Sequence, residues 1–167
     1  MKFKLRKFKR GDEISLQKNI DHEEIAKSTL YIPYPYTLKN AKYWVKRNLK
    51  LNKQKNSNEI NFVIDIDGEV AGSISITNID KKNKKAEIGY WLARKYWGRG
   101  IMTRAVEEIV EYGFKKLKLI RIYAYVFTFN RASARALEKA GFKLEGKLRK
   151  NSIKNGKVYD DLLYSKI

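Results

Sequence analysis

The pattern between residues 86 and 127 constrains the fold more than any other feature of this sequence. Ala86–Leu92 is an apolar run typical of a strand, Gly98 and Gly100 follow in a short turn, and residues 101–117 show an amphipathic helical pattern. A second run rich in β-branched and aromatic residues, Ile120–Phe127, comes next. Two strands that flank one crossover helix run parallel in the same sheet. The sequence therefore predicts an α/β layered domain with a mixed sheet.

Strand and helix signals cover the rest of the chain. Asp67-Gly68 between two alternating runs predicts a β-hairpin. Thr37 suits the N-cap of an amphipathic helix over Leu38–Leu51, and Gly141 suits the end of a helix over Ala132–Ala140. Further strands are expected at residues 2–9, 61–66, 69–76, 142–148 and 158–165, with short helices at 13–19 and 23–28. No linker or repeat interrupts this series, so residues 1–167 are expected to form one domain.

The absence of cysteine excludes disulfides, thiolate metal sites and a covalent cysteine intermediate. No Cys/His cluster or Asp-rich loop indicates a metal, so none is expected. Charged residues alternate with apolar ones at the N-terminus, unlike a secretory leader. No apolar run approaches the ~18 residues of a membrane span. We therefore expect a soluble, cytoplasmic protein without a membrane partner.

The chain is strongly basic, with 37 Lys and Arg against 18 Asp and Glu and a formal net charge of +19. Such a charge attracts polyanions, including a phosphorylated cofactor, RNA or a ribosome surface. The alternative is that the charges are spread over solvated faces, since the lysines are scattered along the chain. Charge alone does not separate these two interpretations.

The turn before the long helix has the features of an anion site. Trp97–Thr103 places two glycines where a strand leads into a helix, so backbone N–H groups and the positive helix terminus face outward. Arg99 adds a positive charge, and a pyrophosphate suits this arrangement. The alternative is a plain tight turn. The segment is neither a Walker A motif nor a G-x-G-x-x-G fingerprint, which argues against an NTPase or a Rossmann enzyme.

Several motifs resemble those of the RimJ/RimL-type N-acetyltransferases of the GNAT superfamily. Ala86–Leu92 together with Trp97–Thr103 resembles the central motif of that family, and Asn130–Ser133 and Lys139–Gly146 are similar to the next two motifs. Asn155-Gly156, followed by Asp160 and Tyr164, resembles the C-terminal strand. The likeness extends more weakly to Pro35-Tyr36-Thr37 and the first strand, so it covers essentially the whole chain.

This resemblance implies the GNAT fold, in which a mixed, mostly antiparallel sheet of about seven strands is flanked by helices. It implies that the central parallel strands splay apart and that acetyl-CoA lies in the wedge between them. The pantetheine arm would pair with backbone around Trp91–Ala93, the diphosphate would lie on N–H groups of residues 98–103, and Asn130 would bind the pantetheine or the acetyl end. The residues expected to bind the cofactor are Trp91, Leu92, Ala93, Trp97, Gly98, Arg99, Gly100, Ile101, Met102, Thr103 and Asn130.

The sequence departs from the family pattern at three kinds of position. Trp97 and Met102 stand where Gln or Arg and a small residue are usual. Because backbone N–H groups bind the cofactor, these departures leave its expected site intact. Leu137 occupies the place where many GNAT enzymes carry a tyrosine general acid, and Arg104 stands where this family usually has Glu.

The chemistry needs a neutral amine that attacks the thioester carbonyl. An α-amino group, with a pKa of ~8, loses its proton more easily than a lysine, with ~10.4, and so suits a weak base. Glu87 is the first candidate base, directly or through a water, and its alternative role is a salt bridge with a lysine. Asp160 is the second candidate, as base or as anchor for the substrate ammonium. Ser133 would donate a proton to the leaving thiolate, or else cap its helix.

Two further features are interpreted more simply. His22, the only histidine, is expected at the surface and not in catalysis. The aromatic segment Tyr31–Tyr36, with Trp44, is expected to line the acceptor entrance, and the alternative is ordinary packing.

The expected function is acetyl transfer from acetyl-CoA to an amine by direct attack in a ternary complex. The expected acceptor is a protein N-terminal α-amine, with ribosomal proteins among the candidates. The alternatives are acetylation of a small amine, such as a polyamine or aminoglycoside, and a non-catalytic RNA- or ribosome-binding module. The sequence leaves open whether the chain is a monomer or a homodimer.

Overall fold

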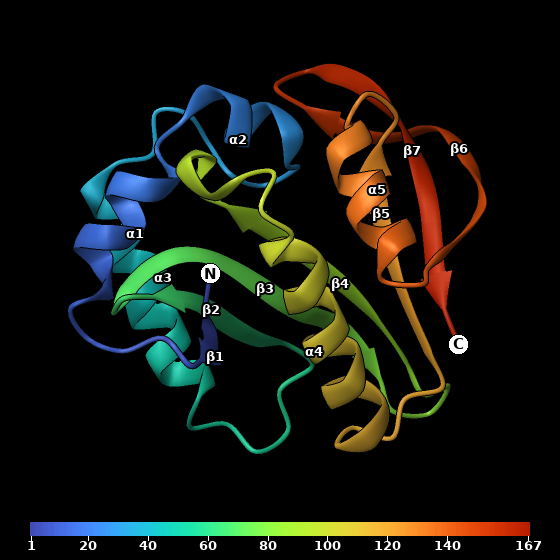
Figure 1. Ribbon diagram of the computed structural model, residues 1–167, viewed down its shortest axis with the longest axis horizontal. Helices are drawn as coiled ribbons and strands as arrows, with labels where there is room; N and C mark the ends of the chain where they lie inside the picture. Colours follow the sequence, from blue (N-terminus) through green and yellow to red (C-terminus); the bar gives the residue numbers. More distant parts are fainter.

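One seven-stranded sheet runs through the computed structural model, which describes residues 1–167 (Figure 1). The strand order is β1-β2-β3-β4-β5-β7-β6, and only the β4–β5 pair is parallel. The strands are β1 (Lys4–Arg6), β2 (Ile60–Ile66), β3 (Glu69–Asp80), β4 (Lys85–Leu92), β5 (Arg121–Phe127), β6 (Lys143–Lys154) and β7 (Lys157–Lys166). The predicted mixed sheet with one central parallel pair is confirmed.

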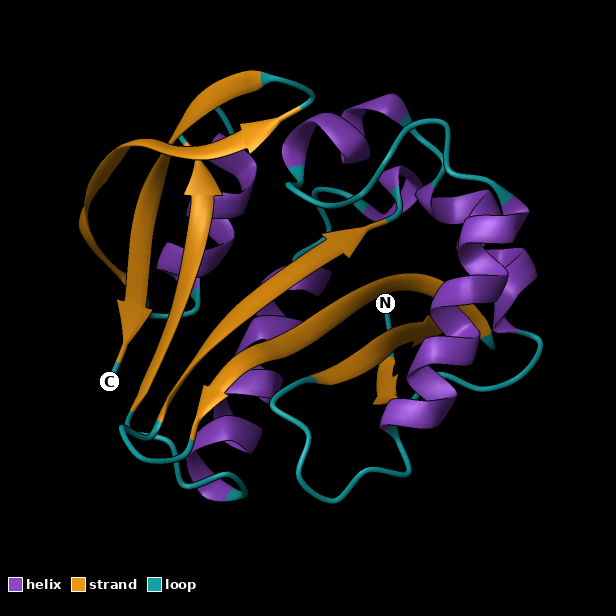
Figure 2. Cartoon of the chain, turned by 180° about the vertical axis from the view of Figure 1, so that it is seen from behind, coloured by secondary structure: helices purple, strands orange, loops and turns teal.

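Helices cover both faces of this sheet (Figure 2). They are α1 (Asp12–Ile20), α2 (Glu23–Ser28), α3 (Leu38–Leu51), α4 (Ile101–Lys115) and α5 (Arg131–Lys139), with a short 3₁₀ turn, η1 (Arg94–Tyr96). The larger core cluster joins the sheet to α4 and α5, and the smaller one joins it to α1 and α3. None of the helices is long and apolar enough to cross a membrane.

Local signals in the sequence explain where these helices begin. Thr37 caps α3 as predicted, because its hydroxyl accepts from the Asn40 amide at 3.2 Å while the Asn40 side chain accepts from the Thr37 amide at 2.8 Å. In α4, Ala105, Val106 and Ile109 form a buried stripe that packs on the sheet. The periodicity of the apolar residues thus fixes which face of each helix is buried.

Three strands differ by more than two residues from their predicted bounds, and β3, expected over residues 69–76, continues to Asp80. β1 was expected over residues 2–9 but pairs only as Lys4–Arg6, because Phe8 leaves the sheet and is buried in the smaller core. β6 was expected to end at residue 148 but continues to Lys154. It does so through an irregularity between Leu148 and Ser152, where Lys150 takes a φ of 51°.

A buried ion pair ties the edge strand β1 to its neighbours. The Arg6 guanidinium contacts both Asp12 in α1, at 2.8 Å, and Asp65 in β2. Burial alone would raise the pKa of Asp65, but hydrogen bonds from Arg6 and the Gly68 amide and the charges of Arg6 and Lys4 hold that pKa below its usual range. A lowered carboxyl pKa gives stability that is present at neutral pH and is lost as the pH falls through the folded-state pKa.

We predict that Arg6→Ala destabilises the fold by about 3–5 kcal/mol, because two buried carboxylates lose their partner. Urea unfolding at neutral pH measures this change, and Arg6→Lys, which keeps the charge but not the fork of donors, should lose less. The wild-type protein should also lose part of its stability below about pH 4. A loss under 1 kcal/mol for Arg6→Ala would contradict this account.

Candidate active site

The central parallel pair separates soon after it begins. β4 and β5 are in register only from the Lys85–Arg121 pair to the Glu87–Tyr123 pair. Beyond it, β4 stays paired with β3, and β5 with β7, to the ends of both strands. The two halves of the sheet therefore diverge toward the carboxyl ends of β4 and β5, as Figure 2 shows. We call the space between these ends the split; it agrees with the predicted splayed pair.

The side of β4 that faces the split carries backbone groups without a strand partner. The Lys84 carbonyl accepts a hydrogen bond from the residue before β5, whereas the Ala93 amide donates one to β3, both at 2.7 Å. Because backbone groups alternate in direction along a strand, those of Tyr90 and Leu92 point into the split. The Trp97 indole N–H donates to the Leu92 carbonyl at 2.7 Å. The remaining groups suit a ligand that carries amides of its own.

A glycine turn lies at the end of the split, between η1 and α4. Gly98 and Gly100 both have a φ of 71°, a left-handed conformation that favours glycine. Gly100 is the N-cap of α4, and no side chain caps this helix. The amides of the first turn therefore have no partner within the helix. Ile101 is buried and anchors the turn to the core.

This turn has the properties of an anion-binding site. A Cβ built at Gly98 or Gly100 would meet no atom within 4 Å, so the space beside the turn is open. The first turn of α4 carries no acidic residue, and Arg99 is exposed beside it. Free amides and the positive end of a fifteen-residue helix favour a phosphate group here. The residues present thus fit the predicted diphosphate cradle.

Glu87 lies on β4 where the parallel pairing ends. Its side chain is on the face opposite α4, since Ala86 and Ile88 on either side belong to the core that α4 covers. The Asn78 amide donates to the Glu87 carboxylate at 2.9 Å, and no lysine or arginine forms a salt bridge with it. Burial raises the pKa of Glu87, the hydrogen bond from Asn78 opposes this rise, and the charge of Asp161 adds to it. A raised carboxyl pKa is what a general base near neutral pH needs.

The acid that acts electrostatically on Glu87 is Asp161, which sequence reasoning missed. Asp161 is buried and accepts from the Asn151 amide at 2.8 Å and from the Ser152 hydroxyl. In β7, Tyr164 and Leu162 pack on the core under α4 and α5, so Asp161 points to the opposite face, the same face as Glu87. This alternation is present in the sequence and could have identified Asp161.

The predicted candidate Asp160 is on the other face of β7. Its carboxylate accepts from the Lys150 amide at 2.8 Å and lies 3.6 Å from the Lys147 ammonium. The Lys150 hydrogen bond is the main reason that the pKa of Asp160 is lowered. The structure therefore brings Glu87 together with Asp161, and not with Asp160. A role for Asp160 as base or anchor stays a prediction.

Ser133 makes a hydroxyl pair across the split. Asn130, not Ser133, caps α5, because the Asn130 side chain accepts from the Ser133 amide at 3.2 Å. The Ser133 hydroxyl is instead 2.8 Å from the Tyr90 hydroxyl of β4. Burial raises the pKa of Tyr90, so its phenol stays protonated and can supply an O–H to Ser133. Capping is thus assigned to Asn130, and the Ser133 hydroxyl remains available as a proton donor.

Three other residues considered in the sequence have structural roles here. Leu137 is fully buried in the core, and His22 lies at the surface, where its ring accepts from the Glu24 amide at 3.3 Å as the N-cap of α2. The Arg104 guanidinium donates to the Met1 carbonyl at 2.6 Å. The expected surface position of His22 is confirmed.

The segment after α2 is held against the β6–β7 hairpin. The Lys154 ammonium donates to the carbonyls of Ala26, Thr29 and Ile32, the last at 2.8 Å. Within the aromatic segment, Tyr31 is fully exposed, whereas Tyr36 is buried and burial raises its pKa to about 12. The predicted aromatic entrance is therefore divided between surface and core.

Comparisons with known proteins agree with this architecture. Residues 2–143 match the family described as acetyltransferase (GNAT) domain. The chain belongs to this family of acetyltransferases.

Its relatives include enzymes named for different acceptors. A ribosomal-protein-serine acetyltransferase of Escherichia coli is 35% identical over 107 residues, which cover 64% of this chain and 59% of that protein. A spermidine N(1)-acetyltransferase of Escherichia coli is 34% identical over 98 residues, covering 59% of this chain and 53% of that protein. The chain spans about half the length of the curated relatives it matches.

A solved structure extends the likeness to most of the chain. The microcin C7 self immunity acetyltransferase MccE, crystallised with acetyl-CoA and AMP, is 29% identical and superposes with a TM-score of 0.81. The match covers 93% of this chain and 85% of that one.

Proposed function

We propose that this protein transfers an acetyl group from acetyl-CoA to a protein N-terminal α-amine, by direct attack in a ternary complex. The split between β4 and β5, with the uncapped glycine turn at its end, is the observation that carries this proposal. The unpaired backbone groups of β4 suit the amides of an extended ligand, and the free helix amides that follow suit its phosphates. The similar structure of MccE holds acetyl-CoA.

Acetyl-CoA would be held largely by backbone groups. Its pantetheine arm would pair along residues 90–93, and its diphosphate would lie on the amides of residues 98–103 with Arg99 beside them. The Asn130 side-chain amide donates one N–H to the Ser28 carbonyl at 3.3 Å, so its second N–H is available for this ligand. Because backbone groups would make most of the contacts with acetyl-CoA, the side chains of Trp97 and Met102 are compatible with this binding site.

The acyl transfer needs two proton movements that nearby side chains can perform. Glu87, whose pKa is raised, would take the proton that the amine loses as its nitrogen bonds to the thioester carbonyl carbon. The carbon–sulfur bond then breaks and leaves a thiolate. Ser133 would pass its hydroxyl proton to this thiolate while it accepts the proton of the Tyr90 hydroxyl, 2.8 Å away. Proton exchange with solvent would then restore Tyr90 and remove the proton held by Glu87. Amide and free thiol are the products.

An α-amine is the acceptor that this weak base suits best. Its pKa of ~8 leaves a sizeable neutral fraction near pH 7, whereas a lysine of ~10.4 stays almost entirely protonated. The ribosomal-protein-serine acetyltransferase among the relatives is named for such a protein substrate.

Polyamine acetylation is the second candidate, and one observation favours it. Glu87 and Asp161 place two carboxyl groups on the face of the sheet opposite α4, where the acceptor amine would bind. There they would attract a small polycation. The spermidine acetyltransferase among the relatives is named for that substrate.

We predict that Gly100→Leu weakens acetyl-CoA binding at least tenfold, because the side chain fills the open space beside the helix amides. A left-handed residue also strains the backbone by about 1–2 kcal/mol. Gly156→Leu is the matched control, since Gly156 has a φ of 75° and equally open space but lies in the β6–β7 turn. Calorimetric titration with acetyl-CoA measures the two affinities. Equal affinities for both variants would contradict a diphosphate site at the glycine turn.

We predict that Glu87→Gln lowers turnover about 10²–10⁴-fold, the range for loss of a general base. In the wild-type protein the rate should rise as the pH increases through the raised pKa of Glu87. This rising limb of the pH–rate profile should be absent in the variant. Asp160→Asn, which removes a carboxylate from the other face of the sheet, should keep the limb. An unaltered profile for Glu87→Gln would exclude it as the base.

The acceptor itself is tested by thiol release from acetyl-CoA. We expect the highest kcat/KM with a peptide that has a free N-terminus, and little release with the same peptide blocked at the N-terminus but carrying lysine. If spermidine exceeds every peptide, the second candidate replaces the first.

A further inference from the structure

Three loops far apart in the sequence meet at one end of the sheet, opposite the split. They are residues 52–59 before β2, 81–84 between β3 and β4, and 116–120 between α4 and β5. The Ile79 amide donates to the Asn58 carbonyl at 3.0 Å, and Lys81 donates to Asn56 at 3.3 Å. The Lys84 carbonyl accepts from the amide of the residue before β5 at 2.7 Å. These contacts make the three loops one continuous surface.

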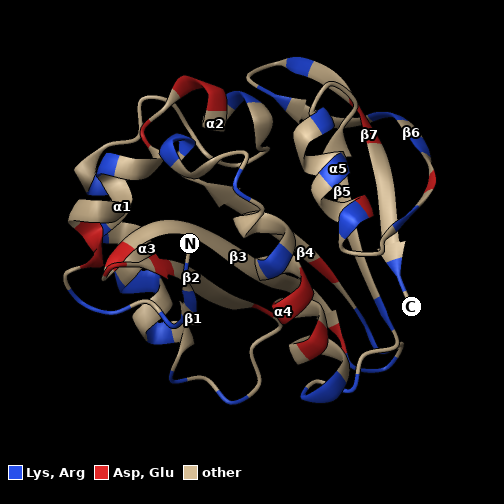
Figure 3. Ribbon diagram, viewed as in Figure 1, with Lys and Arg blue, Asp and Glu red and all other residues tan.

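This surface is rich in exposed lysines, as the blue segments at the lower end of the molecule in Figure 3 show. We call it the lysine end, and its nine exposed lysines are Lys53, Lys55, Lys81, Lys82, Lys84, Lys85, Lys115, Lys116 and Lys118. The lysines therefore do gather in space, although they are scattered along the chain.

Of the three acids near the lysine end, Glu59 and Glu111 form salt bridges, whereas Asp80 keeps its negative charge in the neighbourhood of Lys85. Glu59 is paired with Arg47 at 2.7 Å, and Asp80 accepts from Asn83 at 2.7 Å. Glu111 pairs with Lys115, which is the only one of the nine lysines in a salt bridge. Most of this positive charge is thus free for an external partner.

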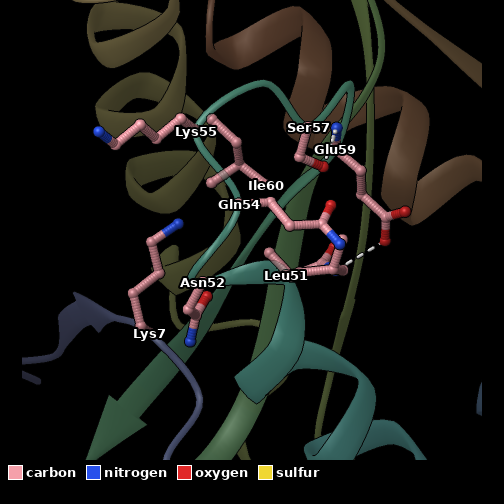
Figure 4. Close-up of a pocket in the computed structure, with 9 residues that line it drawn as sticks. Lys7, Leu51, Asn52, Gln54, Lys55, Ser57, Glu59 and Ile60 are labelled. Carbon is pink, nitrogen blue, oxygen red and sulfur yellow. Dashed lines mark hydrogen bonds between the residues drawn. The ribbon is translucent and has the colours of Figure 1, made fainter.

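A polar pocket of about 130 Å³ continues this surface beyond residues 52–59 (Figure 4). Lys7, Lys55, Asn52 and Gln54 line it together with Glu59, whose carboxylate is paired with Arg47. Ammonium and amide N–H groups donate hydrogen bonds, which phosphate oxygens accept.

We propose that the lysine end docks the protein onto RNA through the phosphodiester backbone. Exposed lysines bind phosphates as point charges without reading sequence, whereas protein interfaces are depleted in lysine and have an apolar centre. The choice of RNA as the partner rests on the proposed function with a ribosomal protein as its acceptor, because such a substrate lies beside RNA; the phosphate contacts themselves do not distinguish RNA from DNA. β4 begins at this surface with Lys85 and ends at Leu92 in the split, about 23 Å away at about 3.3 Å for each residue. RNA bound at the lysine end therefore leaves the glycine turn open, whereas Glu87 lies two residues along β4 from Lys85.

The test compares two triple variants of the whole chain that lose the same charge. Lys55→Gln/Lys82→Gln/Lys116→Gln removes one lysine from each loop, and Lys18→Gln/Lys39→Gln/Lys42→Gln removes three exposed lysines from α1 and α3. Binding to a labelled 20-nucleotide RNA is followed by anisotropy from 50 to 200 mM salt, without acetyl-CoA. The first variant should bind at least tenfold more weakly, and its slope of log K against log salt should fall by about two units. The second should change less than about threefold.

Several results would overturn the proposal. Equal losses in the two variants would mean that net charge, not the lysine end, attracts RNA. Complete competition by polyglutamate would indicate an acidic protein partner instead of RNA. Thiol release with a free peptide should be the same in both variants and wild type. Since it is measured separately, loss of RNA binding and failure of the proposed acetyl transfer can be told apart.

Discussion

The candidate site depends on a parallel pairing that stops after three registers. β4 and β5 can separate because each keeps a complete antiparallel neighbour, β3 on one side and β7 on the other. Backbone groups that leave a ladder without a new partner are costly, and the Trp97 indole satisfies only one of them, the Leu92 carbonyl. The topology thus leaves an unpaired edge, and the proposed binding of the cofactor to backbone groups would need few particular side chains along it.

The sequence predicted those parts of this arrangement that local patterns control. Alternating and helical periodicities located β4, α4 and β5, Thr37 marked the start of α3, and two glycines marked the turn before α4. Their order then fixed the parallel pair, because one helix connects the two strands. The shortened first strand escaped prediction, since the burial of Phe8 in the second core depends on helices far along the chain.

Contacts between residues far apart in the sequence limit how much of the candidate site can be predicted from the sequence. The pair of Tyr90 and Ser133 joins residues 43 positions apart, so no local pattern marks it. Glu87 and Asp161 come near each other only because β4, β5 and β7 lie side by side in a fixed register. Neighbouring residues of β7 face opposite sides of the sheet, so the side on which Tyr164 is buried determines that Asp161, and not Asp160, shares a face with Glu87. The lysines of the three loops are scattered along the sequence and adjacent only in the fold. Assignments of this kind depend on strand parity and on long-range contacts, which local sequence patterns do not display.

The split also separates opposite charges within the proposed site. On the α4 side, uncapped helix amides and Arg99 offer positive potential to phosphates. On the opposite face, burial and the charge of Asp161 raise the pKa of Glu87, so Glu87 favours holding a proton or facing an ammonium group. An anionic thioester and a cationic amine would therefore be drawn to different faces of the same gap and meet where β4 and β5 part. The arrangement accounts for how a chain of such high positive charge could still attract an amine: local fields, not the net charge, act at the point of reaction.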